Sequence, residues 1–308
     1  MTGTHGPDSA RLCTVEHVPA PALPTDLDDC HVLALPSGTD VRALAVAWFV
    51  GATWDSFPLA ADPVTVAAPP ARRSRGSAQE TGPRPGRLRL TAHAGLVGPW
   101  PWSARQARGQ GLPDRDLDLY ALDRQASDPL VLGWMTAAAR RSGGAVISAD
   151  RRQVVVPDAG APVDLTLWTG TVLAQADLVA TVRPFLAGSR LGQVEPLPGG
   201  GYAVTSRFEF DGALTVTAAG RNAVPVAVAG VQWGDYGPWT YTVAWVPPDP
   251  AELTADQPSR THVIARTRVS PIVARAARAL LGAAGGVVVD DGGFPVAEDE
   301  LIQRGTTL

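Results

Sequence analysis

Two stretches of the chain, far apart in the sequence, carry the same order of apolar runs and helical stripes. The run at 33–36 precedes apolar side chains at the spacing of one helix face, namely Val41, Leu44, Ala45, Trp48 and Phe49. The run at 165–168 precedes a similar stripe, which Pro184 ends: Val172, Leu173, Ala176, Val179 and Val182. Each pattern predicts a strand followed by an amphipathic helix.

Alternation of apolar and polar residues follows both predicted helices. In the second stretch it runs over 202–210, and Asp211-Gly212 is a strong hairpin signal before the next apolar run. In the first stretch, 64–66 and 88–93 predict a strand pair. The loop between them, about residues 68–86, is rich in Pro, Arg, Ser and Gly, so we expect it to be flexible.

A longer match joins residues 124–147 to residues 266–289, with seven of 24 positions identical and no gap. Its helix-boundary positions pair as an N-cap, a first-turn proline and a terminal glycine: Asp128 with Ser270, Pro129 with Pro271, and Gly143 with Gly285. A β-branched run follows in each copy. The segments therefore predict a helix, a stop and a strand.

Two further matches keep the same order. Leu33–Thr39 matches Leu165–Thr171 at an offset of 132, and Gly98-Pro99-Trp100 matches Gly237-Pro238-Trp239 at an offset of 139. With the helix match at 142, the offset grows along the chain, as small loop insertions would produce. The ordered matches predict an internal duplication.

Each copy reads strand, helix, strand, strand, helix, strand. That order predicts an α+β fold of two tandem ferredoxin-like (βαββαβ) repeats, with the helices on one face of mixed sheets. We place the repeats at 28–157 and 160–298, with tails at 1–27 and 299–308. The apolar stretch Trp239–Trp245 has no place in this order.

Composition narrows the classes of function. The chain has 308 residues, of which 45% are hydrophobic and 18% charged, with a net charge of −4. A nucleic-acid-binding protein normally shows a basic excess, so we expect no nucleic-acid partner. All 26 basic residues are arginine, so no lysine is present to form a Schiff base or a phosphate-binding loop.

The N-terminal segment and the cysteines point to an ordinary cytoplasmic chain. No basic and apolar leader is visible, and no apolar run approaches the length of a membrane span, so we expect no membrane partner. Cys13, His17, Cys30 and His31 have metal-ligand side chains, but their spacing matches no common zinc module. We therefore expect no metal site and no cofactor.

The best candidate polar site lies on the predicted strand at 88–93. Leu88, Leu90, Ala92 and Ala94 would face one side of it, and Arg89, Thr91 and His93 the other. The face without helices is the usual interaction surface of such a sheet, which makes Arg89 and His93 candidate ligand-binding residues. Arg207 and Glu209 fall on the comparable face of the second copy. The alternative is a solvated strand face.

Aromatic residues in Pro/Gly loops form the second candidate set, which comprises Trp100, Trp102, Tyr236 and Trp239. Such side chains can make a stacking wall for a ligand or anchors for a protein partner. They can equally be plugs that close the ends of a core. Asp290-Asp291-Gly292-Gly293 pairs two carboxylates, although its first interpretation is a hairpin turn. The basic run 72–75 could contact phosphate or belong to a solvated loop.

The sequence shows none of the common catalytic signatures for nucleophile elbows, phosphate-binding loops or zinc proteases. We assign no catalytic residue and favour a non-enzymatic protein that binds a small molecule or a protein partner in a cleft between the repeats. One alternative is an assembly or scaffold subunit, in which case the chain could be a homo-oligomer. The other is an enzyme, cofactor-free or haem-dependent, with His93 or His262 as an axial ligand by analogy of fold.

Overall fold

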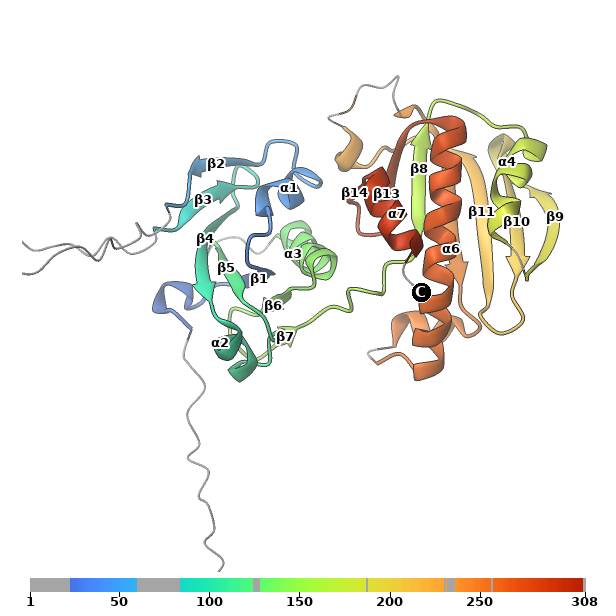
Figure 1. Cartoon of the computed structure of the whole chain (residues 1–308). Helices are drawn as coiled ribbons and strands as arrows, with labels where there is room; N and C mark the ends of the chain where they lie inside the picture. Colours follow the sequence, from blue (N-terminus) through green and yellow to red (C-terminus); the bar gives the residue numbers. More distant parts are fainter. Residues whose placement is uncertain are drawn as a thin grey trace, which may run out of the picture.

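The computed structural model describes residues 23–59, 84–123, 128–186, 188–229, 231, 236–255 and 257–306. In these ranges, the first unit begins with a short 3-10 helix, η1, and contains seven strands and three α-helices. Figure 1 shows their arrangement. Its elements are η1 (Thr25–Leu27), β1 (Val32–Pro36), α1 (Val41–Val46), β2 (Thr53–Ser56), β3 (Gly86–Arg89), β4 (Gly95–Trp102), α2 (Ala104–Gly109), β5 (Leu117–Leu122), α3 (Pro129–Ser142), β6 (Ala145–Ile147) and β7 (Val154–Val155).

The described part of the second unit has seven strands as well, and its helix α6 is much longer than any helix described in the first unit (Figure 1). Its strands and α-helices are β8 (Leu165–Thr169), α4 (Gln175–Val182), β9 (Arg190–Pro196), β10 (Tyr202–Arg207), β11 (Ala213–Gly220), β12 (Trp239–Val246), α6 (Arg260–Ala284), β13 (Val287–Asp290), β14 (Pro295–Val296) and α7 (Glu298–Thr306). The 3-10 helices are η2 (Arg183–Phe185), η3 (Pro198–Gly200), η4 (Val226–Val228) and η5 (Pro250–Thr254).

The two sheets have the same strand order. The first runs β2-β3-β4-β5-β1-β6-β7, and the second, taken from its β9 edge, runs β9-β10-β11-β12-β8-β13-β14. Each strand of one unit therefore has a counterpart in the other, and α1 and α3 correspond to α4 and α6. The matching order supports the internal duplication that the sequence predicts.

The expectation of mixed sheets is wrong, because every strand pair in the described residues is antiparallel. Strand β1 lies between β5 and β6 and is antiparallel to both. Helix α3 carries the chain from β5 across to β6, so these two strands flank β1 instead of pairing with each other. In the second unit, β12 and β13 flank β8 in the same way. The unplaced stretch Trp239–Trp245 is β12, the counterpart of β5.

The predicted ends of the two matched helices are confirmed, and so is the predicted start of α3. The predicted start of α6 is wrong. Asp128 caps α3 by accepting a hydrogen bond from the Leu130 amide, and Gly143 ends it in the left-handed conformation with φ 71°. Helix α6 instead begins at Arg260, with Ser259 as its N-cap, so Ser270 caps nothing and Pro271 lies inside the helix. Helix α6 is therefore longer than α3 at its N-terminal end, and both helices end at the matched glycine.

The Gly-Pro-Trp match joins elements that do not correspond. Trp100 lies within β4, whereas Trp239 is the first residue of β12, the counterpart of β5. The match is therefore a coincidence of composition. The β1–β8 match is correct in element, but the ladders with β6 and β13 place Ala34 opposite Ala145 and Trp168 opposite Val287. These pairings make Ala34 and Trp168 structurally equivalent. The sequence match instead pairs Ala34 with Thr166, so it is shifted by two residues.

Apolar residues on both faces of the first sheet are covered, which corrects the expectation of helices on one face only. One cluster joins the sheet to α1 and α3 and includes Leu33, Leu88 and Trp134. A second cluster on the opposite face contains Leu27 of η1 and Ala107 of α2. That second layer covers β1, β5, β6 and the end of β4 at Trp102, and it contains no residue of β2 or β3. In the second unit, α4, α6 and α7 share one large apolar cluster with the sheet.

Two segments expected as tails contain helical structure. Helix α7 packs on α6 and buries Leu301, and η1 buries Leu27. The predicted strand at 64–66 and most of the predicted flexible loop, up to residue 83, lie outside the described residues. None of the helices within the described ranges is long and apolar enough to cross a membrane.

Side chains fill the junction between the units. Phe294, from the β13–β14 turn, belongs to the apolar cluster of the first unit, and the Trp48 indole donates a hydrogen bond of 2.9 Å to the Gly292 carbonyl. Beside them, Arg141 of α3 contacts both Asp290 and Glu300. The Asp290–Gly293 segment is the predicted hairpin turn, and it also docks the second unit against the first.

Candidate anion-binding site

The site begins with the alternation of strand β3. Leu88 is fully buried toward α1 and α3, so its neighbours Arg87 and Arg89 lie on the opposite, open face of the sheet. Both arginine side chains are about half exposed, at 48% and 52%. The strand therefore presents two guanidinium groups side by side where the η1–α2 layer does not reach.

A β-bulge in the adjacent strand β2 adds a carboxylate. The register passes from Trp54 opposite Leu88 to Ser56 opposite Arg87, which leaves Asp55 as the extra residue. Its carboxylate lies 3.3 Å from Nε of Arg89 and 3.9 Å from Nε of Arg87. The bulge thus brings one acid to both arginines.

A second carboxylate comes from the end of β5. Asp123 accepts two hydrogen bonds from the Arg87 guanidinium, of 2.9 and 2.6 Å. Its backbone amide donates to the Gly95 carbonyl, which fixes the position of the residue against β4. A Cβ at Gly95 would lie 3.1 Å from the Asp123 carboxylate, so a side chain at this position would crowd the ion pair. The Arg87 guanidinium is therefore occupied by the carboxylates of Asp123 and Asp55.

His93 lies in the turn between β3 and β4, not on a strand as predicted. The strand ends at Arg89, and the amides of Leu90 and Thr91 both donate to the Ala94 carbonyl, which closes a tight turn. Within it, the His93 amide donates to the Thr91 hydroxyl over 3.2 Å. The predicted alternation thus holds through Leu90 and fails where the backbone bends.

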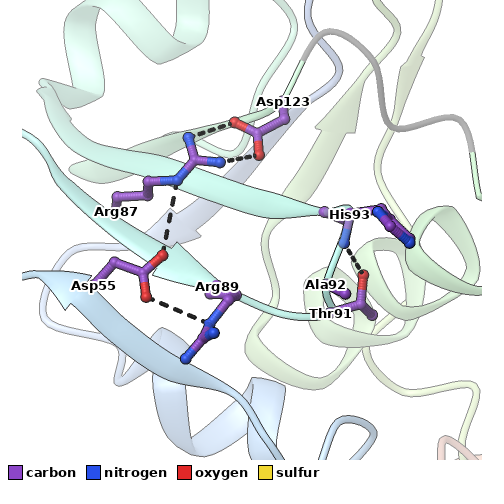
Figure 2. A pocket seen from close by; sticks show the side chains of 8 residues that line it. Asp55, Arg87, Arg89, Thr91, Ala92, His93 and Asp123 are labelled. Carbon is purple, nitrogen blue, oxygen red and sulfur yellow. Dashed lines mark hydrogen bonds and ion pairs between the residues drawn. The ribbon is translucent and has the colours of Figure 1, made fainter.

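The turn and the strands enclose an open depression of about 700 Å³. Figure 2 shows Arg87 held between Asp123 and Asp55, with Arg89 and His93 at separate places around the same depression. Arg89 meets Asp55 through Nε, and neither of its Nη atoms hydrogen-bonds to any residue that the structure describes. The His93 ring likewise has no hydrogen bond within the described ranges. These groups are available to a ligand.

No family model, curated protein or solved structure matches this chain. A function for this chain can therefore be inferred only from the residues that line the depression. No group of three or more His, Cys, Asp or Glu side chains in the described residues could hold a metal ion. Two carboxylates also line the depression, but Asp123 is bound by Arg87 and Asp55 lies against both arginines. The Arg89 Nη atoms, which have no hydrogen-bond partner in the described residues, are donors, which suits an anion.

The hairpin of the second unit contains the equivalents of this turn. Phe208 donates to the Gly212 carbonyl as Leu90 does to that of Ala94, so Arg207 corresponds to Arg89. Glu209 corresponds to Thr91 and is exposed in the turn. Arg89 and Arg207 therefore lie at equivalent positions of the two sheets. Arg207 lies in the second unit and does not line the depression.

The aromatic candidates lie apart from the depression. Trp102 is 5% exposed and belongs to the apolar layer under α2, with Trp100 packed at its margin. Tyr236 is buried with Trp168 beside η4, and Trp239 packs partly buried against the second core. The structure places all four in or against apolar clusters, and it does not bring them together.

Cys30 is buried and unpaired, and His31 beside it is half-buried, at the start of β1. Cys13, His17 and the basic run 72–75 lie outside the described residues. His262, the imagined axial ligand, is buried against Trp245 with ring centroids 4.9 Å apart. The cavity beside it has about 190 Å³, below the roughly 300 Å³ at which small-molecule pockets begin.

The groove between the units does not contain the predicted ligand-binding residues. It has about 480 Å³ and is lined by Arg141, Arg304, Asp290 and Glu300 with residues of the linker. Glu300 pairs with both arginines at 2.5 and 2.6 Å. Burial raises the pKa of Asp290, and the charge of Arg141 opposes that effect. These groups already neutralise one another across the junction.

Of the charged and histidine residues around the depression, Arg89 and His93 were predicted from the sequence, and Asp55, Arg87 and Asp123 were not. Arg87 was within reach of the alternation argument, because it lies two residues before Arg89 on the same face. Asp55 and Asp123 join the site through a bulge and a distant strand end. No local signal in the sequence marks either of them.

Proposed function

We propose that this protein is a non-enzymatic binding protein that takes a small anionic ligand in the depression formed by β2, β3 and the β3–β4 turn. The observation that supports this proposal best is the half-exposed Arg89, whose Nη atoms make no hydrogen bond in the described part of the chain. The location departs from the predicted cleft between the repeats, because the charged groups at that junction are paired.

The charges around the depression favour an anion over a cation. Asp123 is engaged by Arg87 in a bidentate pair, and Asp55 lies against both arginines. A cation would have to compete with two guanidinium groups for these carboxylates. An anion needs only the free Nη donors of Arg89, a ring N–H of His93 and the Thr91 hydroxyl.

Each of these donors has a separate role in the proposed complex. Arg89 supplies the charge and a planar pair of donors that matches a carboxylate or a phosphate. His93 and Thr91 supply single hydrogen bonds from the turn, so they report on the orientation of the ligand. The size of the depression leaves room for more than a bare ion. A phosphorylated or dicarboxylic metabolite fits this description.

The test is isothermal titration calorimetry with inorganic phosphate and with succinate as probes. Removing the Arg89 charge in Arg89→Gln should weaken binding about 10- to 100-fold, since a charged hydrogen bond contributes roughly 1.5–3 kcal/mol. His93→Gln should weaken it less, by about 2- to 10-fold, because a neutral hydrogen bond contributes roughly 0.5–1.5 kcal/mol.

Arg207→Gln is the matched control, because it changes the equivalent arginine of the other hairpin. It should leave the affinity unchanged within about twofold. Binding that Arg207→Gln weakens as much as Arg89→Gln does would contradict the proposal, and so would the absence of binding for both probes at low ionic strength.

A further inference from the structure

Strand β9 is the longest open edge of either sheet in the described residues. It has seven residues, whereas the other edge strands β7, β14 and β2 have two, two and four. Figure 1 shows β9 at the outer margin of the second unit, with β10 on one side. Long edge strands expose unpaired backbone groups that can pair with another chain.

A bulge in β9 changes which of its side chains share a face of the sheet. Val194 lies opposite Val204 and Leu191 opposite Ser206, so both pack toward the helices and the second core. Glu195 lies opposite Ala203 and Arg190 opposite Arg207, so both point to the other face. Without the bulge, residues three or five positions apart would lie on opposite faces.

The edge also carries charges without a partner. Arg190 and Arg207 face each other across β9 and β10, and like charges in directly opposed positions are unfavourable. Within the described ranges, neither arginine nor Glu195 takes part in an ion pair. A carboxylate supplied beside Arg190 would relieve the repulsion.

We infer that β9 pairs with β9 of a second copy of this chain, antiparallel, about a twofold axis between Gly192 and Gln193. Such an axis places Arg190 opposite Glu195 of the second copy and Leu191 opposite Val194 of the second copy. Directly paired residues must point to the same face of an antiparallel sheet, and the bulge is what satisfies this condition for both pairs.

Each type of pair forms twice across the axis, which is the self-complementarity that a twofold dimer requires. The two apolar pairs extend the second core on the helix side, and the two ion pairs lie on the other side. The product is one continuous sheet through both second units. The Arg89–His93 depression lies in the first unit, away from this edge, so the dimer is independent of the proposed ligand binding.

The test is sedimentation-velocity ultracentrifugation of the full chain between 1 and 200 µM, with three variants. Wild type should show a concentration-dependent dimer. Arg190→Glu, which places two acids opposite each other twice, should raise the dimer dissociation constant at least about tenfold. The double charge reversal Arg190→Glu/Glu195→Arg should restore it to within about threefold of wild type.

Arg105→Glu makes the same charge change on the exposed face of α2 and should leave the dimer unaffected. Far-ultraviolet circular dichroism checks that each variant is folded. A wild-type monomer at every concentration overturns the inference. So does a dimer that Arg190→Glu leaves intact, one that the double reversal does not restore, or one that Arg105→Glu weakens equally.

Discussion

In the proposed anion site, Asp55 is the residue that would limit the affinity for a ligand. The carboxylate lies 3.3 Å from Nε of Arg89, so its negative charge opposes a second negative charge brought to the same guanidinium. It also orients that guanidinium from the side away from the Nη atoms. One residue, placed by a bulge, therefore both positions the proposed binding group and lowers its affinity.

Asp55→Asn should tighten the binding of phosphate about 3- to 10-fold, because it removes the competing charge and keeps an oxygen near Arg89. Calorimetric titrations at two ionic strengths measure the change, and the gain should shrink as salt rises. Weaker binding by Asp55→Asn would mean that the carboxylate is part of the ligand site and not a competitor.

Asp164 is a second residue whose charge state matters. Burial, with a smaller contribution from the charge of Asp291, raises its pKa from 3.8 to about 6, although the hydrogen bond from the Trp245 amide opposes this shift. Its carboxylate accepts a hydrogen bond of 2.8 Å from the Trp245 amide, which an asparagine oxygen can also accept. Because the pKa is raised in the folded state, the stability it contributes is present below pH 4 and lost as pH rises through 6.

Asp164→Asn should therefore gain stability relative to wild type as pH rises. Between pH 4 and pH 7.5 the difference in free energy of unfolding should shift by about 1–2 kcal/mol in favour of the variant, allowing for partial solvent exposure. Urea denaturation at a series of pH values measures it. A difference that does not change with pH would show that Asp164 titrates normally.

Helices and strands were predictable from the sequence where local chemistry decides them. Asp128 and Gly143 mark α3 correctly, and Leu88 and Arg89 alternate as expected. The order of strands was not predictable, because β1 pairs with β5 and β6, which lie far along the chain. Strands β2, β4, β5 and β7 and helix α2 were not predicted, so a unit with seven strands and three α-helices in its described ranges was interpreted as βαββαβ. The same limit applied to the candidate site. Arg89 and His93 belong to one local pattern in the sequence, whereas Asp55 and Asp123 reach the site only through long-range strand pairing.

The two candidate caps of α6 offer a test at the scale of one element. Ser259→Ala should destabilise the protein by about 1 kcal/mol, because the Ser259 hydroxyl accepts the hydrogen bond of the His262 amide. Ser270→Ala lies mid-helix and should change the stability by less than about 0.5 kcal/mol. Thermal unfolding of both variants compares them, and equal losses would contradict the assigned start of the helix.

At the scale of the whole molecule, only the second of the two equivalent turns, β6–β7 and β13–β14, contacts the other unit in the interactions of the described residues. Phe294 is 3% exposed and lies in the first unit's apolar cluster, although it belongs to the second unit. The corresponding β6–β7 turn of the first unit instead contacts its own N-terminal segment, where Arg151 donates to the carbonyls of Leu27 and Cys30. The two units thus use turns at equivalent places in the strand order for different contacts.

Phe294→Ala should loosen the two units from each other and cost about 3 kcal/mol or more in the free energy of unfolding. Phe210→Ala is the control, because Phe210 is 73% exposed and its loss should be close to neutral. Urea denaturation and proteolysis of the linker near residues 156–164 follow the change. Equal stability and equal cleavage of the two variants would exclude Phe294 as the docking residue.

The proposed anion site is tested most directly by following backbone amide resonances during a phosphate titration of ¹⁵N-labelled protein. We expect saturable shifts concentrated at residues 87–95 and at Asp55, with those of the equivalent hairpin at 207–213 unchanged. Shifts that are absent, or that fall on the junction around Arg141 and Arg304 instead, would contradict it.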